Sequence, residues 1–568
     1  MKICLQAKNS FSYNIKILHF EGFLYIFENL ENNINMSSIT NFSKRIISIF
    51  AINVIIIFLL IFSIFKISTN KFLDSSQKNF YKLKVSPLRG TIYDCRGVPL
   101  IETTKKILAS IIPNKSNFVP LLNSVSEEKK QEFIKKYFEK SPFIFELSKK
   151  VELKGVKIFE VLDQIFDSCL ACHIIGYLKE ENGVSGIEKS FNDHLKNVSN
   201  IETEYQKNAS GKIISENNYN FNNKLYSSNH GIQLCIDKRI QEIAEKIGKK
   251  YIQKGAIVIT EVPNCEIRAS ASFPEFSPSK IKYLLKSENS DLLNRVNCQY
   301  NLGSIFKLIT AAYLLESGIS KDQIYNCKGA FEFDDGVKIR CFDSKPHGKI
   351  NLENAVSLSC NSMFADFSKN IDPDDFFKFV KKFKLGEKIN IAPELISSPG
   401  NLPKLEELKD KKKMAMFSFG QGSLMVTPLQ ISGLVNSIAS GGMYYEPRLV
   451  EKIINKDGSS ESYHFSLPKK IFKFYTAKQL KNFMRSSIMY GTGKCGNPDN
   501  ISAAGKTSTA ETGMFMNGER INQSWFAGFF PFESPKYSIV VLCENTNLGG
   551  KKCGPVFKEI VEEISKFT

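Results

Sequence analysis

Histidine is scarce in this sequence, and no internal repeat is present. The six histidines stand far apart, at positions 19, 173, 194, 230, 347 and 464, so a histidine-based metal site or catalytic triad has little support. No period of about 20–50 residues recurs, which argues against a solenoid. Hydrophobic residues at 42% and charged residues at 24% are close to the globular average, which argues against wholesale disorder.

Acidic residues are fewer than basic ones, 58 against 76, and the net charge is +18. Such a surface favours a polyanion, either nucleic acid, anionic lipid or an anionic cell wall, and charge alone does not choose among them. The 568 residues exceed one compact core, and at about 150 residues per domain they suggest roughly three to four units.

One uncharged run of 20 residues, from Ile46 to Phe65, is long enough to span a bilayer. The residues that end it lack the small-x-small pattern of a cleaved signal peptide. We therefore predict a cytoplasmic tail at 1–45 and a transmembrane helix at 46–65. The segment from Met36 carries basic residues next to the helix and no acidic ones, as an inner flank does, so we hypothesise that translation starts there and that 1–35 is not translated.

Thirteen cysteines are present, and an odd number leaves at least one unpaired within a monomer. Cys169 and Cys172 have C-x-x-C spacing, but no second pair completes a zinc site. Buried small side chains are the favoured interpretation, disulfides are not assumed, and no metal site is predicted.

A polar, asparagine-rich stretch at 217–229 reads as a linker and predicts a domain boundary near residue 230. Beyond it, 240–252 has helical apolar spacing and 255–260 is a strand-like run. We therefore predict one exported domain at 66–230 and a larger one at 231–568.

Ser304 and Lys307 open an almost wholly apolar helix that should end near Gly318. Positions i and i+3 share a helix face, so the lysine can reach the serine. A serine hydroxyl needs a base, and a lysine serves when burial or a neighbouring cation holds it neutral. S-x-x-K alone is a weak signal, because a capping serine beside an unrelated lysine fits equally well.

Two downstream clusters change that balance: Ser359-Cys-Asn361, and Lys506-Thr-Ser508. In this order, S-x-x-K, S-x-N and K-T-G are the signature of penicillin-binding proteins and serine β-lactamases, which this chain resembles. Runs outside these motifs also resemble class B penicillin-binding proteins, from the anchor to the C-terminus. They are Arg89–Gly97, His173–Tyr177, Gly186–Lys189, Asn294-Arg295, Gly420–Gly422, Val426–Gln430, Gly491–Gly493 and Trp525–Gly528.

The resemblance implies an α+β fold: a penicillin-binding, serine β-lactamase-like transpeptidase domain, with an antiparallel sheet flanked by helices, at 231–568. It stands on an elongated pedestal (dimerisation-type) domain at 66–230, behind one transmembrane helix. The implied function is a D,D-transpeptidase that cross-links peptidoglycan stem peptides and is inhibited by β-lactams.

The resemblance also implies roles for individual residues. Ser304 would attack the penultimate D-alanine carbonyl and hold the donor peptide as an acyl-enzyme. Lys307 would take the serine proton, Ser359 would relay a proton towards the leaving amine, and Lys506 would complete an electropositive cluster. Among binding residues, Asn361 would hold the donor amide and Thr507 would hold the substrate carboxylate. The backbone N–H groups of Thr509 and Ser304 would together stabilise an oxyanion.

Partners follow from the same resemblance: peptidoglycan stem peptides, lipid-linked or in nascent glycan, β-lactams, the cytoplasmic membrane and a SEDS-type membrane glycosyltransferase. The catalytic domain would lie outside the membrane, so nucleic acid is no longer a candidate partner, and no metal or organic cofactor is needed.

Some residues depart from the family pattern. Ser508 replaces the glycine of K-T-G on a strand that approaches substrate, so we expect Ser508→Gly to acylate at least as fast as wild type. Leu302 stands where proline is usual, and Cys95 where arginine is usual. Cys327 and Cys341 bracket a hairpin-like stretch, and whether they pair stays open.

Two alternatives remain. A D,D-carboxypeptidase or β-lactamase would use water in place of the acceptor amine, but Glu394 is a poor match to a deacylating base and a β-lactamase needs no pedestal. A non-catalytic β-lactam sensor or assembly scaffold is kept open by Ser508. A bifunctional class A protein is disfavoured, because the region before the linker leaves little room for a glycosyltransferase domain.

Overall fold

The computed structural model describes most of the chain, and within the described residues it divides into two compact units. The first lies within Met1–Tyr81 and Glu204–Asn218, and the second within Lys82–Thr203 and Tyr219–Thr568. The proposed start at Met36, the linker at 217–229 and Cys169 fall outside the described residues. Those described are 41–78, 80–165, 170–179, 181–196, 199–207, 213–215, 230–284, 290–342, 345–463, 466–516, 518–546 and 550–567.

The first unit contains the apolar segment. It forms α2 (Asn41–Lys78), one continuous helix of 38 residues that extends beyond both ends of the predicted span. Within it, Arg45–Lys66 has a mean hydropathy of 2.9 and no buried side chain. Side chains that are apolar on all sides find no protein core here, so this is a helix long and apolar enough to cross a membrane.

The N-terminal part of the second unit is built on a three-stranded antiparallel sheet. Its central strand β3 (Glu102–Ile111) pairs with β4 (Phe143–Leu147) on one side and β5 (Val156–Ile165) on the other. Helix α4 (Lys130–Phe138) covers the sheet with Phe133, which is fully buried. The rings around Phe133 are those of Phe118, Tyr137, Phe143 and Phe145.

Two of the sequence runs singled out above meet in this unit. Arg89 donates to the carboxylate of Glu188 over 2.6 Å, and Glu188 is fully buried. Burial raises the pKa of Glu188, and the facing guanidinium opposes that rise. Next to Arg89, β2 (Thr91–Tyr93) pairs in parallel with β10 (Gly231–Leu234), so the N-terminal and C-terminal parts of the second unit share one sheet.

A five-stranded sheet forms the centre of the larger domain, and every neighbouring pair in it is antiparallel. This confirms the predicted antiparallel sheet. In spatial order the strands are β12 (Glu266–Phe273), β11 (Gly255–Glu261), β27 (Tyr537–Cys543), β26 (Glu519–Phe530) and β25 (Ala504–Met516).

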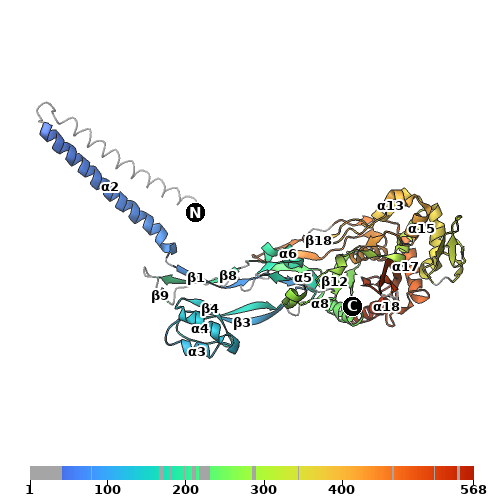
Figure 1. Ribbon diagram of the computed structural model, residues 1–568, viewed down its shortest axis with the longest axis horizontal. Helices are drawn as coiled ribbons and strands as arrows, with labels where there is room; N and C mark the ends of the chain where they lie inside the picture. The colour runs from blue at the N-terminus through green and yellow to red at the C-terminus, as the bar shows by residue number, and fades with distance from the viewer. Residues whose placement is uncertain are drawn as a thin grey trace. The chain divides into compact units, whose positions relative to one another are not determined.

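Both faces of this sheet are buried, because alternate residues of a strand point to opposite sides. On β11, Ile257 and Ile259 join a core that includes α8 (Lys238–Tyr251) and α18 (Gly550–Ile564), which lie beside each other (Figure 1). Ala256 and Val258 join the larger core on the other face. The predicted helix and strand at 240–260 are confirmed.

Helices and short hairpins on that second face carry the polar residues discussed below. The helices are α10 (Lys307–Glu316), α11 (Leu352–Ser357), α12 (Asn361–Phe367), α13 (Pro373–Lys381), α15 (Lys411–Ser418), α16 (Pro428–Ala439) and α17 (Phe474–Met489). The hairpin strands are β14 (Tyr325–Cys327), β15 (Ala330–Glu332), β16 (Lys338–Arg340) and β17 (Gly348–Ile350).

Candidate active site

Ser304 and Lys307 lie on consecutive helical turns, as their spacing predicts. Ser304 is in a 3₁₀ turn, Gly303–Phe306, which continues into α10. The apolar residues of α10 bury the helix, and Lys307 at its start is fully buried while Ser304 stays partly exposed. The Lys307 Nζ lies 2.9 Å from the Ser304 hydroxyl, within hydrogen-bond distance. A candidate nucleophile and its base are therefore in contact.

Burial changes the proton affinity of Lys307. Loss of hydration disfavours the ammonium form and lowers the pKa of Lys307 to about 7. Near neutral pH a large fraction of this side chain is therefore a neutral amine with a free lone pair, which is the form that accepts a proton from a serine hydroxyl.

Residues of the S-x-N segment contact the same amine. Lys307 Nζ donates to the carbonyl of Ser359 over 3.0 Å and to the Oδ1 of Asn361 over 2.7 Å. These two oxygens only accept, so they take the two N–H groups of a neutral amine. The lone pair is then left for the hydroxyls of Ser304 and Ser359, which lie 2.8 Å apart and 2.9 and 3.2 Å from Nζ.

A strained turn holds Ser359 in this position. Its φ of +59° lies in the left-handed region, which a residue with a side chain rarely adopts. The turn connects α11 to α12, and the Cys360 N–H donates to the carbonyl of Ala355 over 2.9 Å. Such a conformation persists only where surrounding contacts enforce it, and it directs both oxygens of Ser359 at Lys307.

The third motif lies on β25. Lys506 is fully buried, and its Nζ donates to the carbonyl of Thr507 over 3.0 Å and to the hydroxyl of Thr492 at 3.5 Å. Burial lowers the pKa of Lys506 well below its usual value, and the nearby charge of Lys307 lowers it further. The hydroxyls of Thr492 and Thr507 are 2.8 Å apart. The sequence did not predict a role for Thr492, and the one feature that pointed to it was its place within the run Gly491–Gly493.

Gly303 allows the nucleophile turn to approach β25. It has φ +69°, and a Cβ there would lie 2.7 Å from both the Thr509 carbonyl and the Ser508 hydroxyl. Its N–H donates to the carbonyl of Gly420 over 3.0 Å. A larger residue at 303 would therefore separate Ser304 from the strand, so glycine is required by both space and φ.

Two side chains hold the residues that precede the nucleophile. The indole N–H of Trp525 donates to the carbonyl of Asn301 over 2.9 Å, and the hydroxyl of Ser508 donates to the carbonyl of Leu302 over 2.5 Å. Ser508 is 2% exposed, so its side chain packs against the nucleophile turn and away from solvent. The residue that replaces glycine thus contributes a contact inside the fold.

The candidate site residues occupy two adjoining groups. Ser304, Lys307, Ser359 and Asn361 form one hydrogen-bonded set; Lys506 and Thr507 form the other with Thr492, and Thr509 borders Gly303. Glu394 is elsewhere: it is exposed and pairs with Lys189 of the pedestal region over 2.7 Å. A serine with a buried amine base, a second serine and a second buried lysine is an arrangement suited to acyl transfer.

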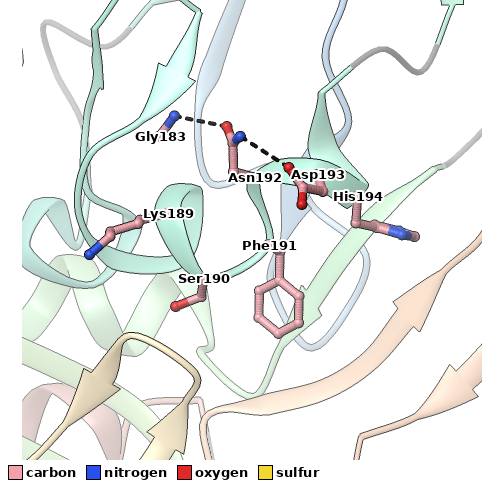
Figure 2. Close-up of a pocket in the computed structure, with 7 residues that line it drawn as sticks. All are labelled: Gly183, Lys189, Ser190, Phe191, Asn192, Asp193 and His194. Atoms are coloured by element: carbon pink, nitrogen blue, oxygen red, sulfur yellow. Dashed lines mark hydrogen bonds between the residues drawn. The ribbon is translucent and has the colours of Figure 1, made fainter.

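A hollow of about 470 Å³ lies at a different place, beside α6 (Gly186–Ser190) and α7 (Asn192–Leu195). Figure 2 shows Asn192 among the residues that line it; the Asn192 Oδ1 accepts from the Gly183 N–H over 2.9 Å. The Arg89 guanidinium donates to the same oxygen. These contacts brace the pedestal region, and the hollow contains none of the candidate catalytic residues.

Comparisons with known proteins agree with this geometry. Residues 255–562 match the family described as penicillin binding protein transpeptidase domain. The chain is 27% identical over 534 residues to stage V sporulation protein D of Bacillus subtilis, covering 86% of this chain and 79% of that protein. It is 29% identical over 465 residues to peptidoglycan D,D-transpeptidase FtsI of Buchnera aphidicola, covering 78% and 77%.

Solved structures give the same fold. One solved structure superposes on this chain with a TM-score of 0.65; its description is "Structural coordination of polymerization and crosslinking by a peptidoglycan synthase complex". It has 21% sequence identity and covers 92% of this chain and 99% of that one. At this identity the likeness establishes the fold, and it confirms the fold class inferred from the motifs.

Proposed function

This chain belongs to the penicillin-binding protein transpeptidase family, and we propose that it cross-links peptidoglycan stem peptides through an acyl-enzyme at Ser304, a reaction that β-lactams inhibit. The observation that carries the proposal is the contact of the Ser304 hydroxyl with both the Lys307 amine, at 2.9 Å, and the Ser359 hydroxyl, at 2.8 Å. An activated serine with two proton-transfer partners is what acyl transfer requires.

In the first step Ser304 attacks the carbonyl of the penultimate D-alanine of the donor peptide. Neutral Lys307 takes the hydroxyl proton, and the new C–O bond leaves a negative charge on the former carbonyl oxygen. The backbone N–H groups of Ser304 and Thr509 would stabilise that oxyanion. The close contact of Gly303 with the Thr509 backbone supports this assignment, because it brings both segments to one place.

In the second step the amide bond breaks and the terminal D-alanine leaves. Its amine takes a proton through Ser359, whose hydroxyl contacts both Ser304 and Lys307. An acceptor amine from a second stem peptide then attacks the acyl-enzyme, loses its proton to the same groups, and restores the Ser304 hydroxyl. Atoms and charge balance without an added oxidant or cofactor.

Substrate binding uses the remaining residues. Thr507 would bind the terminal carboxylate, with the buried Lys506 amine behind it and the Thr492 hydroxyl beside it. Asn361 would bind the donor amide through its side chain. The Asn361 Nδ2 already donates to the Arg340 carbonyl over 3.0 Å, which fixes the orientation of the amide group.

For the domains we keep the boundaries predicted above. The chain has a tail at 1–45, a single membrane span at 46–65, a pedestal at 66–230 and an extracytoplasmic transpeptidase domain at 231–568. The apolar segment of α2 supports the span. A tether next to the membrane suits a lipid-linked substrate and a SEDS-type glycosyltransferase as partner, and the structural match to a peptidoglycan synthase complex is consistent with that partner.

A hydrolytic reaction is the main competing function within the same chemistry. It would need a base that activates water near Ser304, and the Glu394 carboxylate is instead paired with Lys189, while the Glu394 backbone N–H donates to the Ser190 hydroxyl. The alternative of a sensor or scaffold rested on Ser508, whose side chain packs against Leu302. Both observations favour transpeptidation.

The test uses the full chain purified in detergent, incubated with fluorescent penicillin and separately with donor and acceptor stem peptides. We expect stable labelling at Ser304 and formation of a cross-linked dimer of the donor and acceptor stem peptides. Ser304→Ala should lose both, while Ser320→Ala, at an exposed serine just beyond α10, should keep both. Rapid loss of label with release of free D-alanine alone would indicate a hydrolase, and labelling of Ser304→Ala would refute the nucleophile assignment.

A further inference from the structure

Two of the histidines that stand far apart in the sequence lie against each other in the structure. The rings of His194 and His230 have their centroids 4.3 Å apart, with 36° between their planes. His194 is on α7 and lines the hollow described above (Figure 2), and His230 directly precedes β10. The mechanism proposed above uses neither residue.

The histidine pair lies where several segments of the second unit meet. The Gly90 N–H donates to the carbonyl of Leu195, the last residue of α7, over 2.8 Å. The His230 ring packs against Gly90, where a Cβ would lie 3.0 Å from the His230 Cδ2. Strand β10, which begins at the next residue, pairs with β22 (Val450–Ile454). The pair therefore belongs to the contact of α7 with the sheet that contains β2, β10 and β22.

Hydrogen bonds fix which nitrogen carries the proton in each neutral ring. His230 Nε2 lies 2.7 Å from the carbonyl of His194, and His194 Nε2 lies 3.1 Å from the carbonyl of Ile454. Carbonyls only accept, so both Nε2 atoms carry hydrogen and both Nδ1 atoms are bare. The His230 Nδ1 is buried and has no hydrogen-bond partner among the described residues. A second proton on His230 would therefore sit at a buried atom beside another imidazole.

The surroundings oppose a positive charge on His230. This residue is 3% exposed, and burial lowers the pKa of His230 below its usual value. The charges of His194 and Lys456 lower that pKa further, and the hydrogen bonds to the carbonyls of His194 and Ile454 offset the fall only in part. The neutral imidazole fits this place, and the charged one does not.

Other charged groups on the packed elements do not give the same response to acid. These groups are Arg89, Glu188, Asp193, Lys196, Glu451 and Lys452. Ordinary carboxyl, lysine and arginine groups keep their charge between about pH 5.5 and about pH 7.5. Burial raises the pKa of Glu188, so its protonation favours the folded state as pH falls. That effect is opposite in sign to the effect of His230.

We propose that His194 and His230 form an acid-sensitive contact, in which α7 stays closed against β10 and β22 while His230 is neutral, and a proton on His230 opens the contact. The proton comes from solvent and binds the Nδ1 lone pair, and no other bond changes. In the open form His230 is hydrated and regains the usual pKa of about 6.5, so acid favours opening. The inference is independent of acyl transfer, and the extracytoplasmic location proposed above would expose the contact to the pH of the surroundings.

The test measures hydrogen–deuterium exchange of the full chain in detergent at about pH 7.5 and about pH 5.5, with rates corrected for the intrinsic effect of pH. We expect peptides that cover 90–93 and 230–234 to exchange up to about tenfold faster at the lower pH. One pH unit below the pKa of the open state changes the opening equilibrium by about that factor. Peptides of β11 should keep their rates, which separates local opening from global unfolding.

Two variants assign the response. His230→Gln keeps a donor for the His194 carbonyl and has no group that titrates in this range, so its corrected rates should be equal at the two pH values. His173→Gln is the matched control. His173, in α5 (Cys172–Ile175), is also buried, and burial lowers its pKa to about 4. It lies outside the contact, so the acid response should persist in that variant.

Three results would overturn the proposal. One is wild-type protein whose corrected rates at 90–93 and 230–234 are equal at the two pH values. Another is an acid response of the same size in His230→Gln, which would assign it to other groups. If His230→Gln does not fold, the pH profile of the wild type decides. An onset near pH 6.5 supports the histidine pair, and an onset below about pH 5, where carboxyl groups titrate, contradicts it.

Discussion

The Ser508 hydroxyl donates a hydrogen bond to the backbone carbonyl of Leu302, with 2.5 Å between the two oxygens. Both residues depart from the pattern of class B penicillin-binding proteins, in which glycine stands in place of Ser508 and proline in place of Leu302. The two departures thus meet in space, 206 positions apart in the sequence. A proline would stiffen the turn before Ser304 through its ring, and here the Ser508 side chain restrains the same turn from outside.

This contact changes the expectation for Ser508→Gly, which the sequence predicted to acylate at least as fast as wild type. We now expect Ser508→Gly to lose the bond to Leu302 and to acylate about fivefold more slowly, since a hydrogen bond contributes about 1 kcal/mol. The rate constant for labelling by fluorescent penicillin measures the effect.

A double-mutant cycle isolates the pair. Leu302→Pro combined with Ser508→Gly restores the usual family residues at both places, so the double variant should acylate faster than Ser508→Gly alone. A coupling free energy of about 1 kcal/mol is expected. Strictly additive effects of the two substitutions would contradict a restraint that passes between these residues.

Local patterns predicted much of the fold and the catalytic motifs. The helix at 240–252 and the strand at 255–260 follow from apolar spacing, and the structure has them at Lys238–Tyr251 and Gly255–Glu261. Ser304 and Lys307 could be placed on one face because their separation alone fixes it. In these cases neighbours in the sequence determine the geometry.

Other features depend on contacts between distant segments, which no local pattern encodes. Thr492 becomes a site residue only because α17 and the turn after it bring it to Thr507. Cys327, Cys341, His347 and Cys360 come together only when two hairpins and the start of α12 converge. The orientation of Ser508 towards Leu302, and not towards substrate, likewise depends on how β25 packs against the nucleophile turn.

The pH dependence of acylation should report Lys307. Its pKa of about 7 means that the ammonium form, which cannot accept the serine proton, prevails at lower pH. The acylation rate should therefore rise about tenfold per pH unit in acid and level off above about pH 7. A flat profile, or a midpoint near the usual lysine pKa, would contradict this assignment.

The same shift affects folding, and its sign can be checked separately. The pKa of Lys307 is lower in the folded state than in the unfolded chain, so between these two values the unfolded state binds more protons. The contribution of this group to the free energy of unfolding should therefore rise with pH from about 7 to the usual lysine pKa near 10.4. Lys307→Met should flatten that part of the stability profile measured by chemical denaturation.

Lys506 should show a conflict between stability and activity. The side chain is fully buried, and burial strongly disfavours its charge. Lys506→Met keeps most of the volume without the polar group, so the free energy of unfolding should stay unchanged or rise by about 1 kcal/mol. Acylation should nevertheless fall at least about 100-fold.

Lys411→Met, at an exposed lysine that begins α15, is the matched control and should alter neither quantity. Circular dichroism with denaturant and penicillin labelling measure the two effects on the same samples. A large loss of stability in Lys506→Met would mean that the hydrogen bonds of Lys506 to Thr507 and Thr492 outweigh the cost of its burial.

Trp525 offers a signal for acylation that needs no label. It is the only tryptophan in the chain, it is fully buried, and its indole N–H donates to the carbonyl of Asn301, three residues before Ser304. Movement of the nucleophile turn on acylation should change the indole environment, so β-lactam addition should alter the emission intensity at the rate of covalent labelling. Ser304→Ala should show no such slow phase. Labelling without any change in emission would contradict the expected movement of the nucleophile turn. It would mean that the contacts at Asn301 and Leu302 already hold the turn in the reactive geometry while the acyl-enzyme forms.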